Sequence, residues 1–285
     1  MIRLVAVSNN PSYLAQYILI RDSKQMKTRL PLIAKHALIQ KRYNDFQVAA
    51  GAGSLDKIVQ NPDALKLSDD LRACYNGTTA ALTKLKKAIK SAQPSRRLKY
   101  CPMCGTTLPT TFDHYLPAVK FPEFSVHPLN LVPCCARCNS TKDDDWLSGA
   151  GQRQYFHAYT DALPDLQFLV VNLFEHPNLK SVGATFSISK PATISAAAWN
   201  LIESHFGRLG LLDKYDEQSN DQISEILSDC KSFTAAADGT GNARDFLKRQ
   251  AIDRTTAYGR NHWLATLMQT MSKHPNLELW VAASA

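Results

Sequence analysis

The sequence lacks a long run of apolar residues. Its apolar stretches are short: Phe168–Val171, and Leu14–Ile20 interrupted by Gln16, stay far below the roughly 18 residues that a transmembrane helix needs, so we expect no membrane-spanning segment. The first residues also lack an extended apolar core followed by a small-residue cleavage site, so we expect no secretory signal and a cytoplasmic protein. Apolar residues make up 45% and charged residues 20% of the 285 positions, a balance that is typical of a globular chain.

Glutamate is absent from residues 1–100, a region that holds eighteen Lys and Arg residues against six Asp residues. The other residues are mildly acidic, and the whole chain has a net charge of +8. Positive charge concentrated in one region is typical of a protein that binds a polyanion such as nucleic acid. Lysine-rich helix faces exposed to solvent would give the same composition, so charge alone leaves both interpretations open.

The N-terminal third is predicted to be mainly helical. Over Thr79–Ser91, three apolar residues recur at helical spacing while lysines occupy the other faces. A second helix is predicted over Leu30–Tyr43, with Pro31 in its first turn, where a missing backbone N–H costs nothing.

The C-terminal half shows strand patterns first and helical patterns later. Two strands are predicted over Gln167–Phe174 and Ala184–Ser189. Helical periodicity then covers Ile194–Leu209, Asp221–Phe233 and Asn242–Met271. This half is therefore predicted to be a mixed α+β region.

Five of the seven cysteines lie between residues 101 and 138. A cytosolic chain does not rely on disulfides, so such a cluster predicts a metal site. Cys101 and Cys104 form one CxxC pair and Cys135 and Cys138 a second, and two such pairs can hold one structural Zn²⁺ tetrahedrally. Cys134 competes with Cys135 for the third position, and we favour Cys135 because it repeats the spacing of the first pair.

Residues suited to hydrolysis of a phosphodiester surround the second cysteine pair. Asp113 and His114 precede it, Asn130 follows them, and Asn139 comes directly after Cys138. Carboxylate and amide oxygens are ligands for a hard cation such as Mg²⁺, and histidine is the natural general base near neutral pH. Adjacent residues of a strand face opposite ways, so a twist or bulge is needed to bring both the aspartate and the histidine to one site.

The stretch between residues 101 and 145 resembles the HNH endonuclease motif of the ββα-metal type, in its zinc-ribbon variant. The family has an Asp-His pair, a proline three residues after the histidine, an asparagine on the second strand, an Asn or His about nine residues later and a lysine at the end. The matching residues here are Asp113, His114, Pro117, Asn130, Asn139 and Lys142.

The resemblance implies a role for each of these residues. His114 would be the general base that activates water, and Asp113 and Asn139 would hold one Mg²⁺ or Mn²⁺. Asn130 would be mainly structural, bonding across the loop to keep the histidine oriented, and Lys142 would neutralise a phosphate. Some family members have a second metal-binding histidine at the position of Asn139. With an asparagine there, the resemblance implies a hard cation at the active site and zinc only at the thiolates.

Several nearby residues have two interpretations. His127 would either join the site or be an ordinary loop residue, and the loop interpretation is favoured. His157 would either reach the cleft or lie outside it, and the second is favoured. Glu123 and Asp143–Asp145 are interpreted as surface carboxylates.

The basic flank is predicted to line the path of the nucleic acid through phosphate contacts from Lys84, Lys87, Arg96 and Arg97. The layout, a nuclease core with helical flanks, is similar to that of bacterial HNH proteins of anti-phage defence, of the Septu and retron-associated kind. That resemblance implies an ATPase or other regulatory subunit as a partner. A nuclease of a phage or mobile element, or a restriction enzyme for modified DNA, would have the same layout.

The sequence thus predicts an α+β chain with mainly helical flanks around a central zinc-stabilised core. The expected parts are a basic helical region (1–95), the HNH core (96–147) and a C-terminal region of two strands and then helices (148–285). The expected function is that of a metal-dependent DNA endonuclease. The alternative is a non-catalytic, zinc-stabilised module that binds nucleic acid or a partner protein.

Overall fold

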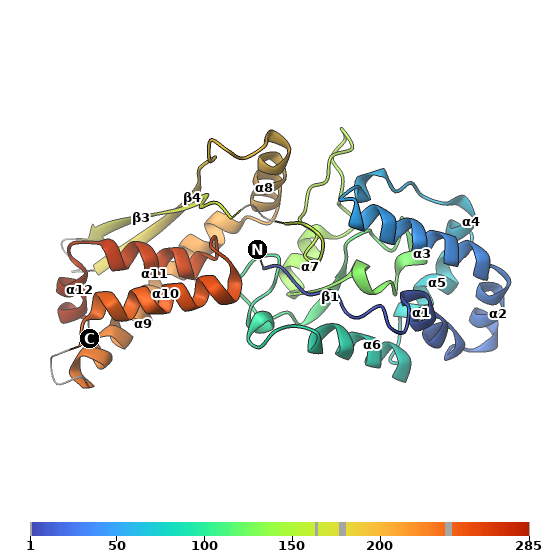
Figure 1. Ribbon diagram of the computed structural model, residues 1–285, viewed down its shortest axis with the longest axis horizontal. Helices are drawn as coiled ribbons and strands as arrows, with labels where there is room; N and C mark the ends of the chain where they lie inside the picture. Colours follow the sequence, from blue (N-terminus) through green and yellow to red (C-terminus); the bar gives the residue numbers. More distant parts are fainter. Residues whose placement is uncertain (1, 163–164, 177–180, 237–240, 285) are drawn as a thin grey trace. The chain divides into compact units, whose positions relative to one another are not determined.

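The computed structural model describes residues 2–162, 165–176, 181–236 and 241–284 (Figure 1). The described residues are mainly helical and include two small sheets, each an antiparallel pair of strands. It divides into two compact units. The first consists of residues 3–103 and 107–162, and the second of residue 2, residues 104–106 and the described part of 163–285. The predicted boundary at residue 147 therefore falls inside the first unit, which also holds both the basic region and most of the predicted core.

The first unit is a set of helices around a short hairpin. Its elements are α1 (Tyr13–Asp22), α2 (Met26–Ala34), α3 (His36–Gly51), α4 (Pro62–Leu65), α5 (Ser68–Tyr75), α6 (Ala80–Ser91), β1 (Thr111–His114), β2 (Leu131–Cys134) and α7 (Ala136–Lys142), with short 3-10 turns between them.

Helix α6 forms as its sequence predicts. The side chain of Thr79 accepts a hydrogen bond from the backbone N–H of Leu82 (3.3 Å) and so caps the first turn. The apolar stripe of Leu82, Leu85 and Ile89 is buried, which leaves the lysines on the outer faces and along the edges of the stripe. The helix ends at Ser91, three residues before Pro94.

The predicted helix Leu30–Tyr43 is wrong in its boundaries. Pro31 lies inside α2 and not at the start of a helix, and α2 ends at Ala34. A new helix, α3, begins at His36 after Lys35, whose φ of −109° is not helical. Proline lacks a backbone N–H and crowds the turn before it, so Pro31 does not account for the break at Lys35, which follows it.

A hairpin followed by a helix forms the centre of the first unit. Strand β1 pairs with β2 in an antiparallel register that sets Thr111 opposite Cys134 and His114 opposite Leu131. Helix α7 follows at once, and its first turn is capped by the sulfur of Cys135, which accepts from the N–H of Cys138 (3.4 Å).

The second unit is a hairpin packed on helices. Strands β3 (Leu169–His176) and β4 (Ser181–Ile188) pair along their whole length, so the two predicted strands are confirmed with shifted ends. Helix α9 packs on β4, and α11 packs on β3 and α10. Figure 1 shows α10 and α11 side by side. The helices are α8 (Ala196–Arg208), α9 (Leu211–Ala236), α10 (Ala243–Tyr258), α11 (Trp263–Lys273) and α12 (Leu277–Ala283).

The single helix predicted over Asn242–Met271 is wrong. Gly259 adopts a φ of +98°, which a helix cannot contain, and it separates α10 from α11. Glycine takes such a backbone at little steric cost, so it ends the first helix and lets the chain turn back. Among the helices of the described segments, none has both the length and the apolar character needed to cross a bilayer.

A buried ion pair lies in the core of the first unit. Arg42 on α3 donates to the carboxylate of Glu123 (2.8 Å) and to the carbonyl of Val59 (2.8 Å). Glu123 is 1% exposed, so its interpretation as a surface carboxylate is wrong. Burial raises the pKa of Glu123, and the guanidinium opposes that shift. A charge removed from water must be paired, and here two distant segments supply the pair.

We predict that Arg42→Ala lowers the free energy of unfolding by about 3–5 kcal/mol, because it leaves a carboxylate buried without its cation. The control is Lys41→Ala on the same helix, which removes an exposed pair with Asp45 and should cost at most about 1 kcal/mol. Urea unfolding of both variants measures the difference. Equal costs would show that the buried pair contributes no more than the exposed one.

Candidate functional site

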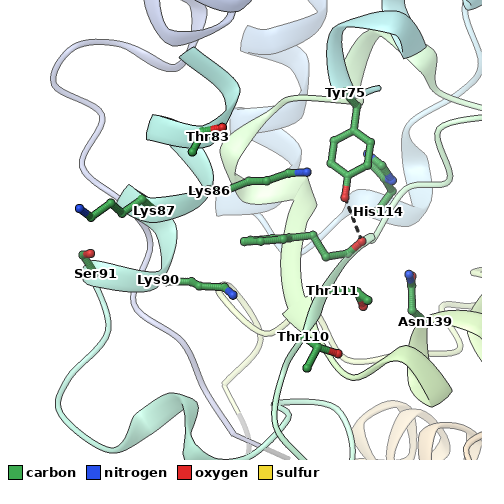
Figure 2. A pocket seen from close by; sticks show the side chains of 11 residues that line it. Tyr75, Thr83, Lys86, Lys87, Lys90, Ser91, Thr110, Thr111, His114 and Asn139 are labelled. Carbon is green, nitrogen blue, oxygen red and sulfur yellow. Dashed lines mark hydrogen bonds between the residues drawn. The ribbon is translucent and has the colours of Figure 1, made fainter. Parts of the chain in front are cut away.

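Two neighbouring hollows in the first unit meet at the end of β1. The larger, about 750 Å³, is lined by β1, by Tyr75 and by one side of α6; the smaller, about 350 Å³, is lined by β1, by the segment that follows it and by α7. His114, Asn139 and Thr111 line both. Figure 2 shows His114 and Asn139 at the border of the larger hollow, opposite the lysines of α6. The structure thus brings together the predicted base and one predicted metal ligand.

The ring of His114 is held on two sides. Its Nε2 lies 2.8 Å from the carbonyl oxygen of Ser125, and the ring of Tyr75 meets it edge-on with centroids 4.4 Å apart. A carbonyl oxygen only accepts hydrogen bonds, so Nε2 carries the proton and Nδ1 of the neutral ring keeps its lone pair. Burial lowers the pKa of His114 to about 4, although the bond to Ser125 opposes that shift. At neutral pH the ring is therefore an uncharged proton acceptor.

Asn130 fixes the loop that carries Ser125. Its side-chain oxygen accepts from the N–H of Leu116 (2.7 Å), and its amide nitrogen donates to the carbonyls of Leu116 (3.0 Å) and Phe124 (3.1 Å). Its own carbonyl accepts from the N–H of Tyr115 (2.9 Å). Asn130 is fully buried, so these bonds are not exchanged with water. The expected bonding across the loop is confirmed.

Asp113 forms a buried ion pair with Lys142. The ammonium of Lys142 lies 3.1 Å from Oδ1 of Asp113 and donates to the carbonyl of His114 (2.8 Å). Lys142 is fully buried, which contradicts its expected place at a phosphate. Burial raises the pKa of Asp113 while Lys142 opposes the shift. In this structure the lysine ties the end of α7 to β1.

The smaller hollow holds two oxygen donors that would suit a hard cation. Asp113 and Asn139 both line it together with His114, and one carboxylate oxygen of Asp113 is not bonded to Lys142. Mg²⁺ takes one or two protein oxygens and keeps water for its other positions. The donor set therefore fits such an ion, with the pair to Lys142 as a competing attraction.

The four cysteines of the two CxxC pairs converge in the interior. The sulfur atoms of Cys101, Cys104, Cys135 and Cys138 all lie within 4.8 Å of one another, and all four residues are buried. Four thiolates around one Zn²⁺ at a Zn–S distance of about 2.3 Å lie roughly 3.8 Å apart, so the cluster fits zinc after a small contraction. The N–H of Cys135 also donates to the sulfur of Cys101 (3.3 Å), as expected for a thiolate acceptor.

Cys134 belongs to β2 and not to this cluster. Its sulfur lies 3.3 Å from the hydroxyl of Thr111 across the hairpin, and burial raises the pKa of its thiol to about 12. The four-cysteine cluster contains Cys135 and not Cys134, in agreement with the choice made from the sequence.

The other two histidines near the motif lie outside the hollows. His127 is fully buried among Tyr13, Tyr43 and Phe46, with ring centroids 4.3–5.3 Å away. His157 is also fully buried and bonds through Nε2 to the carbonyl of Leu129 (2.9 Å). Both favoured interpretations, outside the reactive site, agree with these positions.

The four basic residues that were predicted to contact nucleic acid lie in three different places in the structure. Lys87 lines the larger hollow, but in Figure 2 it points away from His114. Lys84 lines a different hollow, between α6 and the segment before α1. Arg96 and Arg97 follow α6, and the described lining of the three hollows includes neither.

Sequence reasoning missed three residues that line the larger hollow: Tyr75, Lys86 and Lys90. A signal for the lysines was present, because both directly follow buried residues of the apolar stripe of α6 and are one helical turn apart. No signal marked Tyr75, the last residue of α5.

No protein-family model matches the chain, and no solved structure matches it. The chain is similar to protein ea31 of Escherichia phage lambda, with 30% identity over 135 residues. The aligned part covers 47% of this chain and 45% of the phage protein, so the similarity spans less than half of that protein's length.

We predict that the Cys101→Ser and Cys138→Ser variants each lose bound zinc and unfold at a much lower temperature than the wild type. In such a site the free energy of zinc binding contributes directly to the stability of the fold. Metal analysis of purified wild-type protein should find about one zinc per chain. The matched control is Cys134→Ser, which removes the neighbouring thiol but should retain zinc. Loss of zinc in the control together with retention in Cys138→Ser would overturn the assignment of ligands.

Proposed function

We propose that this protein is a metal-dependent endonuclease that hydrolyses phosphodiester bonds of nucleic acid, and of DNA in particular. The observation that carries the proposal is the state of His114. Its ring lines both hollows, its Nε2 is bonded to a carbonyl, and its pKa is low, so it is held as a neutral base beside oxygen donors. The motif that resembles the HNH endonucleases supplies the same residues in the same order.

His114 takes a proton from the attacking water on Nδ1, the nitrogen that keeps its lone pair. The oxygen of that water forms a bond to phosphorus, and the bond from phosphorus to the 3′ oxygen breaks. The 3′ oxygen takes a proton from solvent water and leaves as a hydroxyl, and the phosphate remains on the 5′ side. The bond from Nε2 to Ser125 persists and keeps the resulting imidazolium in place.

Asp113 and Asn139 would hold Mg²⁺ or Mn²⁺ in the smaller hollow. Such an ion, when bound, stabilises the charge that develops on the phosphoryl group and on the leaving oxygen. Asn130 contributes indirectly, because its four bonds fix both ends of the loop that carries the carbonyl of Ser125. Lys142 keeps Asp113 in place and leaves one of its oxygens for the ion.

The similarity to a phage protein bears on the biological setting only. The name of that phage protein states no activity, so the geometry of the site carries the proposed chemistry. We infer a nuclease of a phage or mobile element, with an anti-phage defence protein as the second setting. An ATPase or other regulatory subunit would be the partner in that second setting.

A non-catalytic nucleic-acid-binding module is the second candidate function. The buried pair of Asp113 with Lys142 favours it, because a lysine at this carboxylate neutralises the charge that would attract a cation. Retained nucleic-acid binding without cleavage, across Mg²⁺ and Mn²⁺, would select this candidate.

We predict that His114→Ala lowers cleavage of supercoiled plasmid by about 10²–10⁴-fold, the usual contribution of a general base. Duplex binding and the melting temperature should stay close to wild type. The control is His176→Ala, which removes an exposed histidine of β3 in the other unit and should cleave normally. Cleavage by His114→Ala above a tenth of the wild-type rate, at saturating metal and substrate, would remove this residue from the base position.

We predict that Asp113→Ala and Asn139→Ala lose cleavage in Mg²⁺ and regain part of it when Mn²⁺ is raised, because water can replace one lost ligand. His114→Ala should not respond in this way. The measurement is a metal titration of the nicking rate for all three variants. Equal recovery of the three would mean that base and ligands are misassigned.

Asp113→Ala also leaves Lys142 buried without its partner, so its melting temperature should fall by more than that of Asn139→Ala. Asp113→Asn, which keeps a hydrogen-bond acceptor for Lys142, separates that structural effect from loss of the metal ligand.

A further inference from the structure

Two ammonium groups of α6 converge on aromatic rings inside the larger hollow. Nζ of Lys86 lies 4.0 Å from the ring centroid of Tyr75 and 5.7 Å from that of Phe112, and Nζ of Lys90 lies 5.5 Å from the same Phe112 ring. Figure 2 shows both side chains extending from α6 across the hollow, with Tyr75 beyond Lys86. The two cations therefore share one concave surface.

No carboxylate among the described residues forms an ion pair with Lys86 or Lys90. Lys86 is half-buried, and its pKa is lowered by burial and by the nearby charge of Lys90. Asp113, the buried carboxylate beside His114 on β1, already has its cation in Lys142. The wall of the hollow thus holds two like charges a helical turn apart, which repel each other until an anion is bound.

The Tyr75 ring links this charge to the base. Lys86 lies over the face of the ring, His114 contacts the same ring, and the Tyr75 hydroxyl donates to the carbonyl of Phe112 (3.4 Å). The ammonium of Lys86 and the imidazole of His114 therefore both contact the ring of Tyr75. An anion bound by Lys86 and Lys90 would lie in the same hollow as His114 and beside the reacting phosphate.

We propose that Lys86 and Lys90 form a phosphate subsite that binds the phosphodiester next to the one being cut, on the same strand. This inference rests on the proposed nuclease function. It deepens that function by naming the substrate class as a polynucleotide with consecutive phosphates. Thr83, Ser91 and Thr110 also line this hollow.

A subsite of this kind selects by charge and spacing and not by base. Lysine contacts to phosphate are sequence-blind and release counterions, so they make affinity depend on salt. A substrate with a single phosphodiester fills only the cleavage position, so the two lysines add nothing to its affinity. A strand with neighbouring phosphates gains their attraction as well.

The binding test uses a fluorescent 20-nucleotide strand and its duplex, with EDTA at a concentration that leaves zinc bound. Lys86→Ala and Lys90→Ala should each weaken binding about tenfold, and the double variant should flatten the slope of log K against log salt by about 1.4–1.8. The control is Lys27→Ala, which removes the same charge from an exposed position of α2 that lines none of the three hollows, and should weaken binding less than threefold. Melting curves of all the variants show whether each one keeps its fold. Lys86→Gln serves as a second substitution at the same position.

The cleavage test compares the full-length wild type and variants on the strand and on bis(p-nitrophenyl) phosphate, a diester without a neighbouring phosphate. The ratio of kcat/KM for the strand to kcat/KM for the small diester should fall about tenfold for each lysine removed. An unchanged ratio, or an effect of Lys27→Ala as large as that of Lys86→Ala, would overturn the subsite.

The two proposals fail in different ways. If the lysine variants bind the strand more weakly but no protein cuts either substrate, the anion site stands and the nuclease function falls. If the wild type cuts and the lysine variants bind and cut equally well, the function stands and the subsite falls.

Discussion

The convergence of four cysteine sulfurs is the constraint on which the central hairpin and helix depend. Thirty residues separate the two CxxC pairs, and the sheet between them has only four residues in each strand. Such a short ladder gives little stability of its own. The second pair lies where β2 passes into α7, and Cys135 caps that helix, so closing the cluster fixes the start of the helix that carries Asn139 and Lys142. The positions of the reactive side chains follow from that closure.

The sequence predicted the parts of this site that depend on spacing within a short segment. The cysteine pairs were predicted from their spacing, and the bonding role of Asn130 was implied by the resemblance to the HNH motif; all of these residues lie within about forty positions. The ion pair of Asp113 with Lys142 could not be predicted, because a lysine near a helix end is usually exposed. Tyr75 reaches the site from another helix, and no local pattern reports such a contact.

The same division holds for the fold. Helix α6 has a capping threonine, a regular apolar stripe and a terminal proline, and all three agree, so its prediction was confirmed. The helices that were misjudged contain one residue whose effect depends on the rest of the structure. Pro31 was placed at a helix start because that is its commonest position, and Gly259 was treated as a weak point and not as an end. Burial of Glu123 depends on Arg42, eighty-one residues away in the sequence.

The four bonds of Asn130 have a consequence for how this segment can change over evolution. They tie both ends of the loop between β1 and β2 to one another, so the loop cannot gain or lose residues near these bonds without misplacing Ser125. Most of what holds His114 is thus encoded within one short and length-restricted stretch. A stretch of this kind can be inherited as a block and joined to different neighbours, while α6, which lies outside it, is free to diversify. Related chains should therefore differ more in their flanking helices than in the length of this loop.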